Sequence, residues 1–314
     1  MSTPEYRKSV SCATKPQVTL GVCVRNSEES VKDTIESILV QDYPHWLMEL
    51  IFVDDGSKDN TLSIIQRYMP RIDFRAEVFH TSWKGLGHAR NVVAANAHGD
   101  FILWVDGDMT ISSDYVRKLV GFMDQHCEVG IAKGKLALES GESLLATLET
   151  YSRAAYQTEG YESENTRSKS LGAGGAICRI VPLRKVNGFD ENLKGYCEDW
   201  DVEVRIRDAG WSLCVVDTEC LERARYGLTW RSLWNRYWRR GYFTHYFVHK
   251  RTGLIKHYRW FPPAAFFQGL VHAHSFFRLT HRKRVFLLPW QYAFKMTAFY
   301  LGFLESHSNS YQPK

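Results

Sequence analysis

The sequence predicts an α/β protein with a mostly parallel sheet flanked by helices, followed by a helical, aromatic and basic C-terminal region. Near-continuous apolar strands alternate with amphipathic helices early in the 314 residues, which is typical of a parallel sheet covered on both faces. From Arg223 to Leu304, fifteen Lys and Arg and 23 of the 43 aromatic residues occur, with no Asp or Glu. These two patterns indicate a globular α/β body and a C-terminal region of a different kind.

The expected elements follow the hydrophobic pattern in chain order. Strands are predicted within 17–24, 48–57, 74–80 and 101–105. The intervening helices have inward faces made by Val31, Ile35, Ile38 and Leu39, then by Leu62, Ile65 and Met69, then by residues of 87–97. Ligands of such sheets bind at the carboxyl ends of the strands, so acids that follow these strands are candidate site residues.

After residue 110 the pattern is less regular, and the expected elements are of mixed kind. We expect a helix over 112–123 capped by Ser112 or Ser113, a strand over 129–138, a helix over 143–157, a polar mobile loop over 159–170, a glycine-rich entry to a strand over 171–181, and a charged helix from Glu198 that Gly210 ends.

Asp106 and Asp108 follow an apolar strand, with one glycine between them. Ionised carboxylates repel each other at this spacing, and a hard divalent cation bound by both would offset the repulsion. Mg²⁺ or Mn²⁺ held in this way fills its other positions with water and phosphate oxygens. The alternative is a turn with solvated acids, because Asp-Gly is a common turn pair.

Two further acidic groups have a functional and a local interpretation. Asp54 and Asp55 follow the preceding strand and can accept hydrogen bonds from a ribose or a base, or can form an Asx turn in which Ser57 or Asp59 caps the next helix. Glu198, Asp199 and Asp201 begin a helix, where the dipole stabilises acids; a carboxylate there can also take a proton from an attacking hydroxyl. Spacing alone does not separate these interpretations.

The C-terminal region has the composition of a lipid headgroup zone. Aromatic residues recur every four positions at Tyr226, Trp230, Trp234, Trp238 and Tyr242, which favours packing or a membrane belt over a sugar platform. The segment 285–304 has the length of a membrane span, but Pro289, Gln291 and Lys295 interrupt it, so we expect an interfacial or re-entrant segment. His245 and His249 have zinc-compatible i, i+4 spacing, although half-buried interfacial histidines are the favoured interpretation.

Charge and cysteine content suggest a cellular setting. Outside the basic region the chain holds 25 bases against 35 acids, so the positive charge is concentrated in the C-terminal region. This distribution predicts an anionic partner for that region, and we expect a membrane surface rather than nucleic acid. Seven cysteines without a C-x-x-C pair favour reduced thiols. The first sixteen residues lack the apolar stretch of a secretory signal. We therefore expect a cytoplasmic protein, peripheral on the cytoplasmic face of a membrane.

Taken in order, "VDDGSKDNT", "GHARNVVAANAHGDFILWVDGD", "GAGGAICR", "VNGFDENL" and "EDWD" resemble glycosyltransferase family 2, the large inverting group with the GT-A fold. The resemblance covers about residues 17–220. It implies a nucleotide-sugar donor, UDP- or GDP-linked, and Mg²⁺ or Mn²⁺ as cofactor. The site residues that it implies are Asp199 as general base, Asp108 and Asp106 at the metal, and Asp54, Asp55, Arg90, Asp106, Gly174, Gly175 and Glu198 around the donor.

The sequence also departs from the family pattern. Some members supply a histidine metal ligand after the segment matching "VVDTECLE", where this chain reads "RARYG". Processive members carry Q-x-x-R-W, which "WNRYWRRGY" matches poorly, so we expect transfer of one sugar. Arg236, Arg239 and Arg240 in that segment either contact a diphosphate or lipid phosphate, or face solvent and headgroups; the second interpretation is favoured.

The resulting hypothesis is an inverting glycosyltransferase that acts on a lipid-linked or membrane-proximal acceptor. Its expected organisation is a polar tail (1–16), a nucleotide-sugar-binding half (17–110), an acceptor and catalytic half (111–222) and a membrane-associating region (223–314). Two alternatives remain. One is a metal-dependent nucleotidyl- or phosphotransferase, disfavoured because no G-x-x-x-x-G-K loop is present. The other is a non-catalytic protein whose aromatic, basic region binds nucleic acid.

Overall fold

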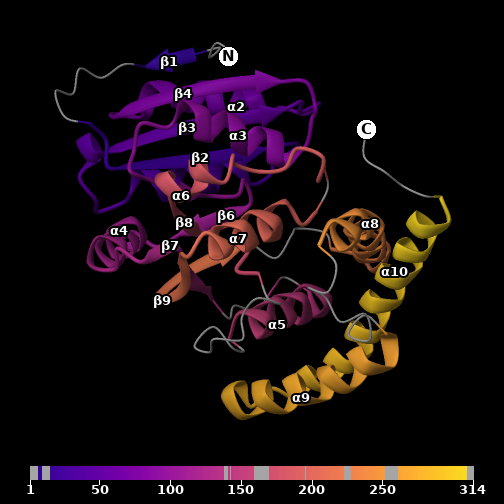
Figure 1. The fold of residues 1–314 in the computed structure, drawn as a ribbon. Helices are drawn as coiled ribbons and strands as arrows, with labels where there is room; N and C mark the ends of the chain where they lie inside the picture. Colours follow the sequence, from indigo (N-terminus) through magenta and orange to yellow (C-terminus); the bar gives the residue numbers. More distant parts are fainter. Residues whose placement is uncertain are drawn as a thin grey trace. The chain divides into compact units, whose positions relative to one another are not determined.

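The chain divides into two compact units in the computed structural model (Figure 1). The structure describes residues 6–8, 15–137, 141, 143–158, 170–194, 196–222, 228–251 and 261–309. The first unit comprises Met1–Lys135, Lys169–Glu191 and Glu198–Glu222, and the second comprises Leu136–Ser168, Asn192–Cys197 and Arg223–Lys314. Of the loop expected at 159–170, all but Ser170 lies outside the described residues.

The first unit is built on a nine-stranded sheet with the order β1-β4-β3-β2-β5-β8-β7-β9-β6. The strands are β1 (Tyr6–Lys8), β2 (Val18–Val24), β3 (Met48–Asp55), β4 (Arg75–Thr81), β5 (Phe101–Trp104), β6 (Met109–Ile111), β7 (Val129–Leu136), β8 (Ala176–Arg179) and β9 (Ser212–Glu222). The neighbours β4, β3, β2 and β5 run parallel, which confirms the predicted core of the sheet. All eight residues of β3 are buried, as expected for a strand covered on both faces.

The other strand pairs for which a register is given are antiparallel, so β1 and β8 run opposite to the core strands that they join. β1 pairs antiparallel with β4, β8 with β5 and β7, and β6 with β9. The hydrophobic pattern does not predict β1, β6 or β9. β1 and β6 have three residues each, too few for a hydrophobic period, and β9 mixes half-exposed apolar positions with Asp217 and Glu219.

Helices of the first unit pack on this sheet (Figure 1). They are α1 (Val31–Leu39), α2 (Thr61–Tyr68), α3 (Leu86–Asn96), α4 (Tyr115–Gln125), α6 (Ile180–Lys185) and α7 (Glu198–Asp208), with short 3₁₀ turns η1 (His45–Leu47) and η2 (Met69–Arg71). The expected cap of α4 is wrong. The helix starts after Asp114, and the Ser112 hydroxyl donates to the Asp114 carboxylate at 2.7 Å rather than holding a helix N–H.

The second unit is helical. It contains α5 (Leu144–Thr158), α8 (Trp230–Lys250), α9 (Pro262–Thr280), the 3₁₀ turn η5 (Lys283–Leu287) and α10 (Leu288–Ser308). A capping box between Thr229 and Ser232 starts α8. The helix α10 packs against α8, α9 and α5. In the parts of the chain that the structure describes, every helix is too short or too polar to cross a bilayer.

The polar residues that interrupt 285–304 face the interior of this unit. Lys295 is buried and its Nζ lies 2.9 Å from Oε2 of buried Glu149, which also accepts a hydrogen bond from Gln291 at 3.2 Å. Burial by itself raises the pKa of Glu149, but Lys295 and two arginines lower it to about 2. The face of α10 opposite this ion pair exposes Trp290, Leu301 and other apolar residues.

The aromatic stripe of α8 is used for packing. Trp230 and Trp234 meet the ring of Phe294 edge-on at 4.9 and 5.2 Å, and Trp238 stacks on Tyr242 at 5.3 Å. Tyr226, the first residue of the expected stripe, lies outside the described residues.

We expect Lys295→Met to destabilise the protein by about 3–5 kcal/mol, because it leaves the Glu149 carboxylate buried without its cation. Chemical denaturation at pH 7 measures this difference, with Lys283→Met, at an exposed lysine of η5, as the matched control. Loss of the same size in both variants would contradict the role of the ion pair.

The same comparison has a defined pH dependence. The folded-state pKa of Glu149, about 2, lies below its ordinary value of 4.5, so its stabilising contribution is present above pH 4.5 and is lost as the pH falls toward 2. The difference in unfolding free energy between wild type and Lys295→Met should therefore shrink over that range. A difference that stays constant would show that Glu149 is not ionised beside Lys295.

Candidate active site

The turn after β5 presents the acid pair singled out in the sequence. Asp106 and Asp108 are both partly exposed, whereas the intervening Gly107 is buried. The hydroxyl of Ser30 donates to the carbonyl oxygen of Gly107 at 2.7 Å and fixes the turn. The two carboxylates therefore stand at the carboxyl end of a parallel strand, where the fold class predicts a ligand.

Arg90 links this turn to the start of α7. Its buried guanidinium lies 3.7 Å from Oδ1 of Asp106 and 2.9 Å from Oε1 of Glu198. The rings of Trp104 and Phe189 pack around it, with centroids 5.9 and 5.4 Å from the guanidinium carbon. Burial lowers the pKa of Arg90, but Glu198 and Asp106 outweigh this and raise it, so the cation stays charged.

The three acids of "EDWD", in the first turn of α7, differ in burial and in their partners. Glu198 is buried in its ion pair with Arg90, and burial together with Asp199 raises its pKa to about 7. Asp201 is also buried and is bound by Arg205 of the same helix at 2.8 Å, which is a structural contact. Asp199 is only partly buried; one of its oxygens accepts from the N–H of Trp200 at 2.8 Å. Of the three, only Asp199 has a partly exposed side chain.

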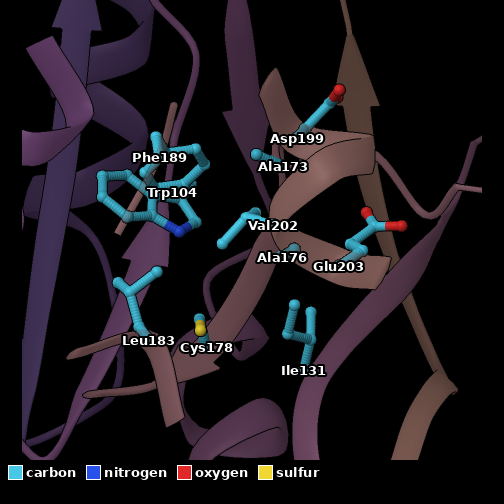
Figure 2. A pocket seen from close by; sticks show the side chains of 10 residues that line it. All are labelled: Trp104, Ile131, Ala173, Ala176, Cys178, Leu183, Phe189, Asp199, Val202 and Glu203. Atoms are coloured by element: carbon cyan, nitrogen blue, oxygen red, sulfur yellow. The ribbon is translucent and has the colours of Figure 1, made fainter. Parts of the chain in front are cut away.

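A small cavity lies behind Asp199 (Figure 2). Its lining is mostly apolar and includes Trp104, Leu183 and Val202, while the Asp199 carboxylate points away from these residues (Figure 2). Glu203, one turn further along α7, also borders the cavity. Asp199 thus borders the cavity, with its carboxylate directed away from the apolar residues.

The glycine-rich loop is anchored by Lys133 and Glu203, two residues that no sequence motif indicates. Glu203 accepts hydrogen bonds from the N–H groups of Leu171 and Gly172 at 3.0 and 2.9 Å. Lys133, buried on β7, donates to the carbonyl oxygens of the same two residues at 2.9 and 3.2 Å. A lysine inside the apolar part of "VGIAKGKL" was the available signal, because a buried lysine needs a partner.

This loop approaches the acid pair so closely that one position requires glycine. A Cβ added at Gly174 would lie 2.2 Å from Oδ2 of Asp106. Gly175 has φ +77°, donates its N–H to the Trp104 carbonyl at 2.8 Å, and accepts at its own carbonyl from the Tyr115 hydroxyl at 2.6 Å. The structure therefore brings together Arg90 with Asp106 and Glu198, and Gly174 with Asp106.

Asp54 and Asp55 have local partners at the end of β3. Asp54 is fully buried, bonded by both donors of Ser57 and by His80, whose Nδ1 lies 2.8 Å away. Asp55 accepts from the N–H groups of Lys84 and Gly85 at 2.8 and 2.9 Å. Ser57 therefore serves the Asx turn, whereas Asp59 accepts from the N–H of Thr61 at 3.1 Å, and Asn60 occupies the cap position of α2.

The acid pair offers a ligand set suited to a hard divalent cation. It supplies carboxylate oxygens only, and Asp106 shares its charge with Arg90. Within the described ranges, the only cluster of three possible metal ligands is a group of histidines in the second unit, so a cation at the aspartates would need water or phosphate oxygens to complete its shell. The "RARYG" segment lies outside the described residues.

Comparison with known proteins identifies a family and several relatives of the chain. The family model described as Glycosyl transferase family 2 matches residues 19–185. Over 101 residues the chain is 34% identical to poly(ribitol-phosphate) beta-N-acetylglucosaminyltransferase TarS of Staphylococcus aureus, covering 32% of this chain and 18% of TarS. Over 197 residues it is 27% identical to poly-beta-1,6-N-acetyl-D-glucosamine synthase of Staphylococcus epidermidis, covering 62% of this chain and 45% of that protein. The chain thus matches less than half the length of either curated relative.

Solved structures share the fold over nearly the whole chain. The crystal structure of S. aureus TarS 1-349 in complex with UDP has a TM-score of 0.54 at 18% identity, covering 94% of this chain and 92% of that one. The mannosyltransferase PcManGT from Pyrobaculum calidifontis, in complex with GDP-Man and Mn²⁺, has a TM-score of 0.65 at 15% identity, covering 99% and 90%. These matches confirm the α/β fold class that the sequence predicts.

We expect Gly174→Ala to destabilise the protein by about 1–3 kcal/mol, because its Cβ would overlap the Asp106 carboxylate and force the loop or the acid to move. Thermal or chemical unfolding measures the change. Gly121→Ala is the control: nothing lies within 4 Å of its Cβ position in α4, so this substitution should be neutral or stabilising. Equal effects of the two substitutions would contradict the close approach at Gly174.

Proposed function

The chain belongs to glycosyltransferase family 2, and we propose that it is an inverting, metal-dependent enzyme that transfers one sugar from a UDP- or GDP-linked donor to a hydroxyl or phosphate acceptor. The observation that carries the proposal is the position of Arg90. This one cation contacts the D-x-D turn through Asp106 and the E-D motif through Glu198, so that the two motifs share one site.

In this proposal Asp199 is the general base. Its neighbour Glu198 is held by Arg90, while its own carboxylate is partly exposed and faces away from the apolar cavity. A carboxylate in that position takes the proton of the acceptor hydroxyl as the oxygen attacks the anomeric carbon from the side opposite the diphosphate. Attack from that side inverts the anomeric configuration.

Asp108 and Asp106 are proposed to hold Mg²⁺ or Mn²⁺. When bound, the cation would stabilise the charge that grows on the departing diphosphate. Arg90 keeps Asp106 oriented, and Gly174 leaves room for it against the loop. Gly174 and Gly175 are proposed to form the surface that the donor sugar or the acceptor contacts.

Asp54 and Asp55 are proposed to serve the nucleoside in different ways. Asp54 is fully buried and shapes the turn through Ser57 and His80, so it acts on the donor indirectly. Asp55 accepts from the backbone of Lys84 and Gly85 and from the Thr81 hydroxyl, which leaves about one of its four acceptor sites for a donor N–H or O–H. The nucleotides in the solved relatives, UDP in TarS and GDP-Man in PcManGT, support a nucleotide-sugar donor of either base.

The second unit is proposed to bind the surface of an anionic membrane and so bring the enzyme to a lipid-linked or membrane-proximal acceptor. Exposed apolar residues gather on α9, η5 and α10, including Phe267, Leu279, Phe286 and Trp290. Exposed bases accompany them at Arg278, Arg282, Lys283 and Arg284. Apolar and basic side chains on the outer faces of helices fit an interfacial location on the cytoplasmic face.

Family membership argues against both alternatives. A nucleotidyl- or phosphotransferase would share the D-x-D turn, but it would not need the partly exposed carboxylate of Asp199 beside the buried Glu198 at the start of α7. A non-catalytic nucleic-acid-binding protein would not need the linked acids and Arg90.

The two aspartates should be separable by kinetics and binding. We expect Asp199→Asn to lower the rate of sugar transfer by about 10²–10⁴-fold and to keep the affinity for the donor, because the substitution removes only the proton acceptor. Asp108→Asn should instead abolish the metal dependence of donor binding. Calorimetry with UDP- and GDP-sugars in Mn²⁺ measures binding, and product analysis measures transfer and anomeric configuration. Asp217→Asn, on an exposed carboxylate of β9, is the control. Normal transfer by Asp199→Asn would refute its role as base.

Membrane binding should depend on the basic face. Bases near an anionic surface contribute about 1 kcal/mol each, so replacing Arg278, Lys283 and Arg284 with Gln should weaken binding on the order of 100-fold. Flotation with vesicles of anionic and of zwitterionic lipid measures this. The control variant replaces three exposed bases of the first unit, Lys32, Lys58 and Arg67, with Gln. Equal flotation of both variants would contradict the proposed surface.

A further inference from the structure

Three histidine side chains converge in the second unit, outside the site described above. His245 and His249 lie one turn apart on α8, and His307 lies on α10. Nε2 of His245 is 2.9 Å from Nε2 of His249 and 3.1 Å from Nδ1 of His307. One ligand nitrogen from each ring lies within 4.8 Å of the others, and no other group of three possible ligands occurs in the described residues.

The packing of two helices brings these rings together. Trp230 packs on Phe294 at one end, and His245 meets His307 at the other, so α8 and α10 run in the same direction. Glycines at 241 and 302 let the backbones touch, because a Cβ at either position would lie 1.9 or 2.1 Å from a carbonyl oxygen of the other helix. Both helices therefore end beside the histidines, and the partial negative charge of two helix C-termini favours a cation there.

Hydrogen bonds among the three rings cannot all form at once. In a neutral imidazole each ring nitrogen carries either one proton or one lone pair. Nε2 of His245 faces two nitrogens, so its single proton or lone pair must be shared between them. A metal ion instead accepts the lone pairs of all three rings at once. At Zn–N distances of 2.0–2.1 Å, tetrahedral ligand nitrogens lie about 3.3 Å apart, close to the separations of His245 from its two neighbours.

We propose that His245, His249 and His307 bind one divalent transition-metal ion, Zn²⁺ in the first place, which ties the C-terminal ends of α8 and α10 together. Imidazole ligands suit Zn²⁺ and its neighbours in the transition series and not Mg²⁺. His245 is buried against the ring of Phe303, whereas His249 and His307 are exposed, so solvent can occupy a fourth position. The histidine site differs from the aspartate pair in its ligands, which are nitrogens rather than oxygens, and it lies in the second unit rather than the first.

The test uses the full-length protein without a histidine tag, stripped of metal by a chelator. Calorimetric titration with ZnCl₂ should give one equivalent bound, with an increase in the thermal midpoint. CoCl₂ should give the visible absorption of a four-coordinate ion. His249→Ala and His307→Ala should each weaken Zn²⁺ binding by more than the roughly 10–100-fold that losing an outer hydrogen-bond partner of a ligand costs.

Matched variants separate the proposed site from general effects. His274→Ala removes an exposed histidine of α9 and should leave the titration unchanged. His307→Cys should retain binding through a thiolate, and Asp108→Asn should still bind one Zn²⁺. Both alanine variants alter exposed rings, and circular dichroism shows whether they fold. The proposal is overturned if the wild type binds no stoichiometric Zn²⁺, or if His249→Ala and His307→Ala bind as His274→Ala does.

Discussion

The buried guanidinium of Arg90 is the interaction on which the rest of the first unit's site depends. Glu198 is buried, and each of Asp106 and Asp199 raises its pKa, so these carboxylates repel one another through a medium of low polarity. Arg90 contacts two of them, and its planar fork can address both at once. Without that cation, the D-x-D turn and the start of α7 would have no electrostatic reason to lie together. The acids can be close because the cation is buried with them.

A second level of support comes from the glycine-rich loop. Lys133 and Glu203 bind the two carbonyl oxygens and the two N–H groups of Leu171 and Gly172, so that all four backbone groups of that peptide pair have side-chain partners. Burial and the nearby Asp199 raise the pKa of Glu203 to about 7, so the bonds that Lys133 donates are the charge-assisted ones, which are stronger than neutral hydrogen bonds. They fix the loop three residues before Gly175, and this allows Gly174 to sit against Asp106 without a Cβ. The precision of the site therefore rests on side chains that do not face a substrate.

Sequence patterns predicted those features that have a period or an ordered motif. The parallel strands, the helices α1, α2 and α3, the acids at strand ends and the family were predicted because apolar runs and ordered motifs are local signals. Contacts between distant segments could not be predicted from local patterns. Lys133 binds Leu171, 38 positions away, and Lys295 binds Glu149, 146 positions away. The buried Asp54 contacts His80, 26 positions away. In α10, the polar residues that resembled interruptions of a membrane segment proved to face the interior.

The proposed histidine site and the aspartate pair differ in a way that bears on metal selectivity. At a given site, Zn²⁺ binds more tightly than Mn²⁺, so affinity alone would let Zn²⁺ displace a catalytic Mg²⁺ or Mn²⁺. Selectivity must come from ligand type: oxygen ligands around a diphosphate suit Mg²⁺ and Mn²⁺, whereas three imidazoles suit Zn²⁺. Arg90 strengthens this division, because its positive charge next to Asp106 lowers the affinity of the bare aspartate pair for any cation until an anionic diphosphate is present. Metal binding at the aspartates would then be coupled to the donor, while the histidines would bind their ion without it.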